Sequence, residues 1–289
     1  MARPTVQLHT IQQWQSQSPE TRLFILQHIK LKDRLYRFLE EQNKRDNAFN
    51  EAKWVRCRKC NDSGYPGYVL LEPRYDGLHP SQVGHPCLLK VYNDMVGVSG
   101  ETKIEPRKRL LFDLGHAVHH QFQSYGEAGA WGPNYRKEVE VSSRFQDLAK
   151  QLMLEGHADA DNILTIDITD HPFIYEVGIV HEYKTTNSNI FEKLHRPKPE
   201  HKQQAMLYGA ALNRPIIVYL YMNKNDSNLL DFPVEFEPTL WEQLFNKVSI
   251  LKDYYDKAKP PPGETGFHCR ECPYVYSCST AKTAQAARR

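Results

Sequence analysis

Two spacings of hydrophobic residues alternate along this chain. Strand-like patterns of apolar and polar positions dominate three central segments, residues 136–145, 152–167 and 173–185. Apolar runs at 214–223 and 229–237 predict two further strands. Helical patterns predict helices at 18–49, about 81–93, 107–126, 199–213 and 238–258.

The order of these elements predicts an α/β (α+β) fold, because strands and helices share one stretch of chain. Residues 57–86 are broken by several glycines and prolines and predict a loop-rich region. We therefore expect a helical and loop-rich N-terminal extension over 1–80 and a main domain over 81–289. A proline-rich linker, 259–266, leads in that domain to a cysteine tail at 267–278.

Composition narrows the class of protein only slightly. A net charge of +2 over 289 residues means that a nucleic-acid partner would need clustered basic residues. The longest apolar run, 216–222, is too short to cross a membrane, and the N-terminus lacks the apolar stretch of a signal peptide. We therefore expect a cytoplasmic protein without a membrane partner, whose six cysteines stay reduced or bind metal.

Three charged residues on two predicted strands are the candidate chemistry. Glu182 and Lys184 are two positions apart, so they point to the same face of their strand. If the strand of Asp159 pairs with theirs, two carboxylates and an ammonium converge, and the carboxylates suit a hard divalent cation. The alternative is a turn aspartate and a surface ion pair. A calcium-binding loop over 159–170 is excluded because Leu164 occupies the position that needs glycine.

Four short patterns in a fixed order surround these residues. They are Gly115 to His119 (G-x-x-x-H), Gly156 to Asp159 (G-x-x-D), Glu182 to Lys184 (E-x-K) and Gln204 to Tyr208 (Q-x-x-x-Y). This order resembles the PD-(D/E)XK nuclease superfamily, and within it the RecB-like exonucleases, over roughly residues 81–280. The proline that usually precedes the first acid is absent.

The resemblance implies a restriction-endonuclease-like mixed sheet flanked by helices and a metal-dependent DNA exonuclease. It implies that Mg²⁺ or Mn²⁺ is bound by His119, Asp159, Glu182 and the backbone carbonyl of Tyr183. It also implies that Lys184 is catalytic and that Gln204 and Tyr208 steady the active site and the DNA. Three other residues are weaker alternatives: His116 and His120 as metal ligands or surface histidines, and Asp161 as a helper or a solvated acid.

The cysteines extend the resemblance. CRISPR-adaptation exonucleases and AddB-type helicase–nucleases hold an iron–sulfur cluster with one cysteine before the nuclease core and three after it. The matching residues here are Cys87, Cys269, Cys272 and Cys278, which implies a 4Fe-4S cluster. Cys57 and Cys60 leave a zinc alternative open, either as a ribbon with Cys269 and Cys272 or as a small site with His79 or His85.

Basic residues near the predicted site suggest DNA as the partner. They are Arg107, Lys108 and Arg109 before the histidine helix, and Lys193, Arg196, Lys198 and Lys202 after the catalytic strand. A solvated loop is the alternative for the second group. We expect a preference for single-stranded ends and partners from recombination, replication or CRISPR adaptation. The competing functions are a structure-specific endonuclease and a DNA-binding or assembly subunit that does not cut.

Overall fold

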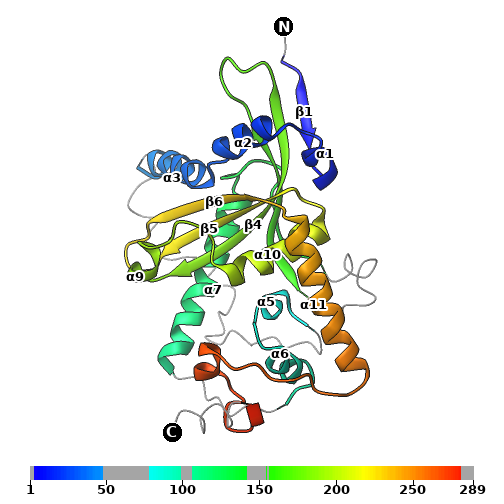
Figure 1. The fold of residues 1–289 in the computed structure, drawn as a ribbon. Coiled ribbons are helices and arrows are strands. Elements are labelled where there is room, and N and C mark those ends of the chain that lie inside the picture. The colour runs from blue at the N-terminus through cyan, green and yellow to red at the C-terminus, as the bar shows by residue number, and fades with distance from the viewer. Residues whose placement is uncertain (1–2, 48–77, 99–105, 142–153, 155, 281–289) are drawn as a thin grey trace.

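The computed structural model describes residues 3–47, 78–98, 106–141, 154 and 156–280. In this part of the chain a six-stranded mixed sheet forms the centre of the molecule, and helices cover both of its faces (Figure 1). The strands lie in the spatial order β2-β3-β4-β5-β6, with β1 paired to β4. The predicted fold class, a mixed sheet flanked by helices, is confirmed.

Five of the strands coincide with predicted ones. They are β2 (Arg136–Glu140), β3 (His157–Ile166), β4 (Ile174–Thr186), β5 (Ile216–Asn223) and β6 (Leu229–Glu235). β3 is antiparallel to β2 and β4, β5 is parallel to β4, and β6 is antiparallel to β5. Pro233 is tolerated because β6 is an edge strand, where a missing N–H breaks no ladder. The end of the strand predicted at 136–145 and the start of the one predicted at 152–167 lie outside the described residues.

The sixth strand, β1 (Thr5–Leu8), was not predicted. It pairs in parallel with the first part of β4, up to the pair Leu8 and Val177, and β5 takes over the same side of β4 from Ile179. Gly178 lies between the two partners. A side chain there would bring its Cβ within 2.5 Å of the carbonyl oxygen of His9, so glycine lets the chain leave the sheet.

The N-terminal helices cover one face of the sheet. They are α1 (Ile11–Gln15), α2 (Pro19–His28) and α3 (Leu31–Asn47). The prediction of a single helix over 18–49 is wrong, because the backbone is extended at Ile29 and the helix ends there. Because the helix ends at Ile29, the side chains of Ile25, Ile29 and Leu31 all lie in the core, where they are fully buried. Ser18 caps α2 and Pro19 is its first residue.

Residues 5–35 therefore share their core with the sheet. Their apolar side chains pack against Val177 and Ile179 of β4 and against Ile216, Val218 and Leu220 of β5. The helix α7 (Pro106–Glu127) joins this face through Val118 and Phe122. Residues 48–77 lie outside the described part of the chain, so the domain boundary near residue 80 stays a prediction.

The other face carries α10 (Pro199–Leu212) and α11 (Pro238–Asp256), both of which were predicted. They pack on Val180, Ile217 and Tyr219 through Met206, Leu207, Tyr208, Leu244 and Val248. The helix predicted over 81–93 is instead two short helices, α5 (Pro80–Val83) and α6 (Leu88–Met95). The chain between them contains Gly84 and Pro86, which do not favour a helix.

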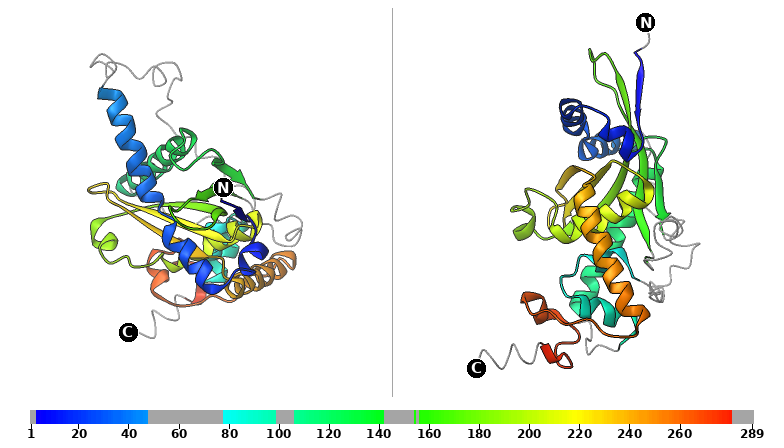
Figure 2. Two further views of the ribbon diagram at one scale, coloured as in Figure 1. Left: turned by 90° about the horizontal axis from the view of Figure 1, so that it is seen from above. Right: turned by 45° about the vertical axis from the view of Figure 1, so that its right-hand side comes forward.

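The C-terminal tail returns to α6. After α11 the chain passes through the 3₁₀ helix η2 (Phe267–Glu271), which lies near α6 at one end of the molecule (Figure 2). The hydroxyl of Tyr274 donates to Asp94 Oδ1 at 2.8 Å, which fastens the tail to this helix. A short helix, α9 (Ser188–Phe191), follows β4. None of the helices in the described ranges is long and apolar enough to cross a membrane.

Candidate active site

Strand pairing brings the predicted charged residues together. The antiparallel register pairs Ala160 with His181, so Asp159, one position further along, lies next to Glu182. Alternation along β4 then directs Glu182 and Lys184 to the face covered by α10. The backbone N–H of Tyr183 donates to Asp159 Oδ2 at 2.7 Å, which fixes the carboxylate against the neighbouring strand.

Glu182 is the most unusual group of the site. Its side chain is fully buried, and Lys184 Nζ lies 2.5 Å from Oε1. Apart from this ion pair, neither carboxylate oxygen has a hydrogen-bond partner among the described residues. Burial raises the pKa of Glu182 to about 7, and the charge of Asp159 adds to the increase, while Lys184 opposes it. The Lys184 ammonium is thus the one partner that balances this buried carboxylate among the described residues.

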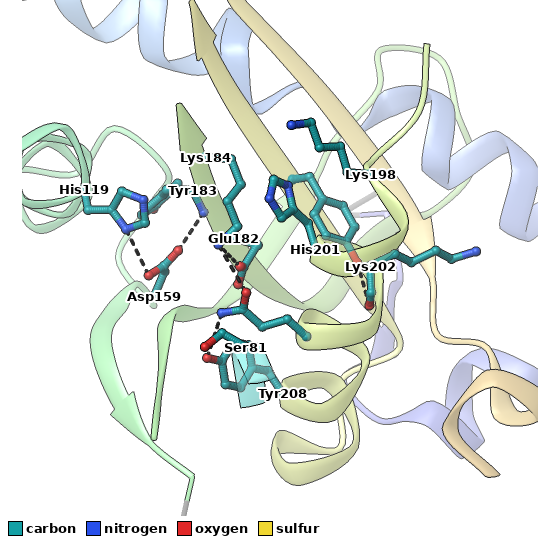
Figure 3. Close-up of polar contacts among 12 residues, drawn as sticks. Ser81, His119, Asp159, Glu182, Tyr183, Lys184, Lys198, His201, Lys202 and Tyr208 are labelled. Atoms are coloured by element: carbon teal, nitrogen blue, oxygen red, sulfur yellow. Dashed lines mark hydrogen bonds and ion pairs between the residues drawn. The ribbon is translucent and has the colours of Figure 1, made fainter. Parts of the chain in front are cut away.

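The helix α7 contributes one histidine to the site. His119 Nδ1 lies 3.3 Å from Asp159 Oδ1 (Figure 3). His116 and His120 are exposed on the helix surface. Burial opposes charge on both partners, but the pair still raises the pKa of His119 and, with Lys184 and the Tyr183 amide, lowers the pKa of Asp159. The interpretation of His116 and His120 as surface histidines fits their exposure.

These residues match a hard divalent cation by the chemistry of their donors. Asp159 and Glu182 offer carboxylate oxygens, and two of those oxygens are buried without hydrogen bonds. In their present spacing, however, no three His, Cys, Asp or Glu side chains of the described ranges form a metal-binding group. The donor set therefore fits the cation, although the side chains are held in ion pairs with His119 and Lys184.

The predicted support from α10 is present as a hydrogen-bonded chain. Lys184 Nζ donates to Gln204 Oε1 at 3.4 Å, and Gln204 Nε2 donates to the hydroxyl of Tyr208 at 3.1 Å. Only 2% of Tyr208 is exposed, so its ring lies in the core. The expectation that Tyr208 also steadies DNA directly does not fit this burial. Its position allows it to orient Gln204, and through Gln204 the lysine.

Asp161 differs from both interpretations given to it. It is neither solvated nor directed at Glu182, because 1% of its side chain is exposed and two arginines hold it. Arg214 donates to both of its oxygens, at 2.6 and 2.9 Å, and Arg136 binds Oδ2 as well. Asp161 therefore links β2 and β3 to Arg214, in the turn between α10 and β5, which is a structural role.

The basic residues near the site differ in exposure and in ion pairing. Arg196 is exposed and Lys198 half-buried, whereas Lys202 Nζ lies 2.5 Å from Glu237 Oε1. Lys193 is exposed beside α9. The side chains of Arg107, Lys108 and Arg109 lie outside the described residues, so their proposed contact with DNA stays a prediction.

Four cysteines line one cavity at the far end of the molecule. Cys87, Cys269, Cys272 and Cys278 surround it together with residues of α6 and the tail, and all four are free thiols. Cys87 is the N-cap of α6, rather than a residue within the helix, and its sulfur accepts the Glu264 N–H at 3.5 Å. Burial raises the pKa of the Cys272 thiol. Cys57 and Cys60 lie outside the described residues.

Two features of the site were not anticipated from sequence. β1 supports the strand that carries Glu182, and His201 of α10 lies near Lys184 (Figure 3). The first had no usable signal, because four residues carry little periodicity. The second had one: His201 precedes Gln204 by three positions, which places both on one helix face.

Comparison with known proteins gives loose structural likenesses. No family model and no curated protein matches the sequence. The crystal structure of SSO0001 matches with a TM-score of 0.44 and 16% identity, covering 72% of this chain and 88% of that one. An alkaline exonuclease (LHK-Exo) from Laribacter hongkongensis matches with a TM-score of 0.35 and 13% identity, covering 64% and 94%.

A second structure of LHK-Exo, in complex with dAMP, matches with a TM-score of 0.35 and 12% identity, covering 63% of this chain and 89% of that one. All of these TM-scores are low. The function therefore has to be argued from the residues of this chain.

Proposed function

We propose that this protein is a metal-dependent nuclease that hydrolyses DNA phosphodiester bonds. The observation that carries the proposal is the buried carboxylate of Glu182. Among the described residues its oxygens have no partner other than Lys184, and Asp159 lies beside it. A protein seldom buries a charge with so few partners unless the site is used, because burial without compensation is costly.

Each residue has a role that follows from its position. Asp159, Glu182, the Tyr183 carbonyl and His119 would hold Mg²⁺ or Mn²⁺, which would polarise the phosphate and lower the pKa of a water molecule. Lys184 carries a positive charge beside Glu182, where it can orient the attacking water and offset charge that develops on phosphate. Gln204 holds the lysine, and Tyr208 holds Gln204.

Exonucleolytic cleavage that prefers single-stranded ends is the finer proposal. Its support is the exposed Arg196 and the half-buried Lys198 in the segment that leads into α10, which suit contact with a flexible phosphate backbone. The test is cleavage of end-labelled single-stranded and duplex DNA in Mn²⁺, with closed circles as control. Loss of label from single-stranded ends supports it. Cutting circles as fast as linear DNA would favour the endonuclease, and cleavage of blunt duplex faster than single strand would contradict the strand preference.

The requirement for metal and for the buried acid is tested in the same assay. EDTA and Glu182→Gln should each abolish cleavage, while Glu242→Gln, a matched change on the exposed side of α11, should leave it unchanged. DNA binding without cleavage by the wild type, in any divalent cation, would instead support a non-cutting DNA-binding subunit.

A 4Fe-4S cluster bound by Cys87, Cys269, Cys272 and Cys278 is proposed as a second, structural cofactor. Four thiols around one cavity fit a cubane cluster by number and by ligand type. Protein purified without oxygen should be brown and contain about four irons per chain. Stoichiometric zinc without iron would replace this proposal with the zinc alternative. Colour retained in Cys57→Ala and lost in Cys87→Ala would separate the two cysteine sets.

A further inference from the structure

One face of α10 carries three polar residues toward the active site. His201, Gln204 and Tyr208 are three and four positions apart, so they form a single stripe on the helix. Gln204 and Tyr208 are occupied by each other and by Lys184. His201 is half-buried one turn earlier, and Figure 3 shows its ring on the side of α10 that faces β4, between Lys184 and Lys198.

The hydrogen bonds around Tyr221 suit the tautomer of His201 that carries its hydrogen on Nε2. The Tyr221 hydroxyl accepts the backbone N–H of Lys198 at 3.1 Å and lies 2.7 Å from His201 Nδ1. The oxygen accepts from Lys198, and the hydroxyl proton can donate to Nδ1. Nδ1 is then an acceptor, and a neutral imidazole carries its hydrogen on Nε2.

The ring stays neutral under ordinary conditions. Burial lowers the pKa of His201 to about 3, and the charges of Lys184 and Lys198 contribute to the decrease. A neutral histidine of this kind neither gives up nor takes up a proton near pH 7, so it is unsuited to acid–base catalysis. What remains is hydrogen-bond donation from Nε2, for which the described residues supply no acceptor.

We propose that His201 is a substrate-positioning residue whose Nε2–H donates a hydrogen bond to a non-bridging oxygen of a DNA phosphate at or next to the cleaved bond. The inference rests on the proposed nuclease function and adds a residue to it. A phosphate oxygen fits this place because the ring stands between two ammonium groups, which attract an anion and repel a cation. Tyr221, through its contact with Nδ1, orients the imidazole ring so that Nε2–H faces the phosphate.

Two substitutions separate the two ring nitrogens. His201→Asn keeps a polar group near the place of Nδ1 and removes the donor at Nε2, whereas the longer side chain of His201→Gln can return an N–H near Nε2. We expect His201→Asn to raise KM for DNA about tenfold with kcat within about twofold, the loss typical of one hydrogen bond to a charged group. His201→Gln should recover most of it, and both should unfold at the wild-type temperature.

The decisive measurement removes the acceptor instead of the donor. Oligonucleotides carrying one stereopure methylphosphonate, at the cleaved phosphate or at either neighbour, lack one non-bridging oxygen. At one of these positions the wild type should lose about tenfold in kcat/KM while His201→Asn loses nothing more, because the two changes remove the same hydrogen bond. Tyr221→Phe should lose an intermediate amount, since the imidazole can then populate both tautomers.

The outcomes keep the two proposals apart. Additive losses at every position, with a wild type that cleaves DNA, overturn the role of His201 and leave the nuclease intact. A His201→Asn variant with unchanged KM does the same. Absence of DNA cleavage by the wild type overturns both.

Discussion

Two buried carboxylates on the paired strands β3 and β4 are treated in opposite ways. Asp161 is bound by Arg214 through both oxygens and by Arg136, so its charge is fully matched. Glu182, equally buried, has the ammonium of Lys184 beside one oxygen and no other partner among the described residues. A buried carboxylate whose oxygens are all bound by arginines thus has a structural role, whereas one with a single partner is available for chemistry.

The largest expected effect is the loss of cleavage in Glu182→Gln. The amide keeps the shape of the side chain but removes the charge that would hold the cation, so kcat should fall about a thousandfold, equivalent to roughly 4 kcal/mol of transition-state stabilisation. Single-turnover cleavage in Mn²⁺ measures it. A variant that cuts like the wild type would remove Glu182 from the active site.

Asp161→Asn should instead lower the stability of the folded protein. It leaves the largely buried guanidinium of Arg214 without its carboxylate, and breaking a buried pair from one side costs about 3 kcal/mol of unfolding free energy. Urea unfolding followed by circular dichroism measures the change. Asp226→Asn, on an exposed turn, is the matched control. A stability equal to that of the wild type would show that the arginines do not depend on Asp161.

Binding of Mn²⁺ without DNA should sharpen the contrast further. A cation that binds only the folded protein stabilises it by about 2.7 kcal/mol at one hundred times its Kd. We expect this gain in the wild type and in Asp226→Asn, but not in Glu182→Gln, as measured by the shift of the urea midpoint with Mn²⁺ concentration. Equal gains in all three proteins would place the cation elsewhere.

The smallest effect extends the comparison to two lysines. Lys202 is paired with Glu237, whereas no ion pair holds Lys198 within the described residues. If Lys198 contacts a phosphate, Lys198→Ala should reduce the slope of log K against log salt for single-stranded DNA by about 0.7. Lys202→Ala should leave the slope unchanged. Fluorescence anisotropy over a salt series, in Asp159→Asn to prevent cleavage, measures both, and equal slopes would contradict the distinction.

The sequence predicted the parts of the site that depend on local spacing. Glu182 and Lys184 share a face because strands alternate, and Asp159 joins them because β3 and β4 are neighbours in sequence and in space. The helix with Gln204 and Tyr208 followed from its periodicity. Each of these inferences needs contacts between elements that follow one another along the chain.

The rest depended on contacts that local patterns do not encode. Asp161 could not be recognised as structural, because its partner Arg214 lies 53 positions later, after α10. The break at Ile29 was missed because apolar residues continue through it, and only the sheet decides which way they face. The burial of Tyr208 was missed because an aromatic residue on a mostly buried helix gives no sign of which side meets solvent.

β1 and β5 pair with successive parts of the same side of β4, and this arrangement has a consequence for folding. Pairing of Thr5 with Ile174 closes a very long loop, and such contacts form late because chain entropy opposes them. Until β1 docks, Ile174 to Val177 would be an open sheet edge on the strand that carries Glu182, and open edges can pair with other chains. Pairing with β1 covers this edge in the folded protein.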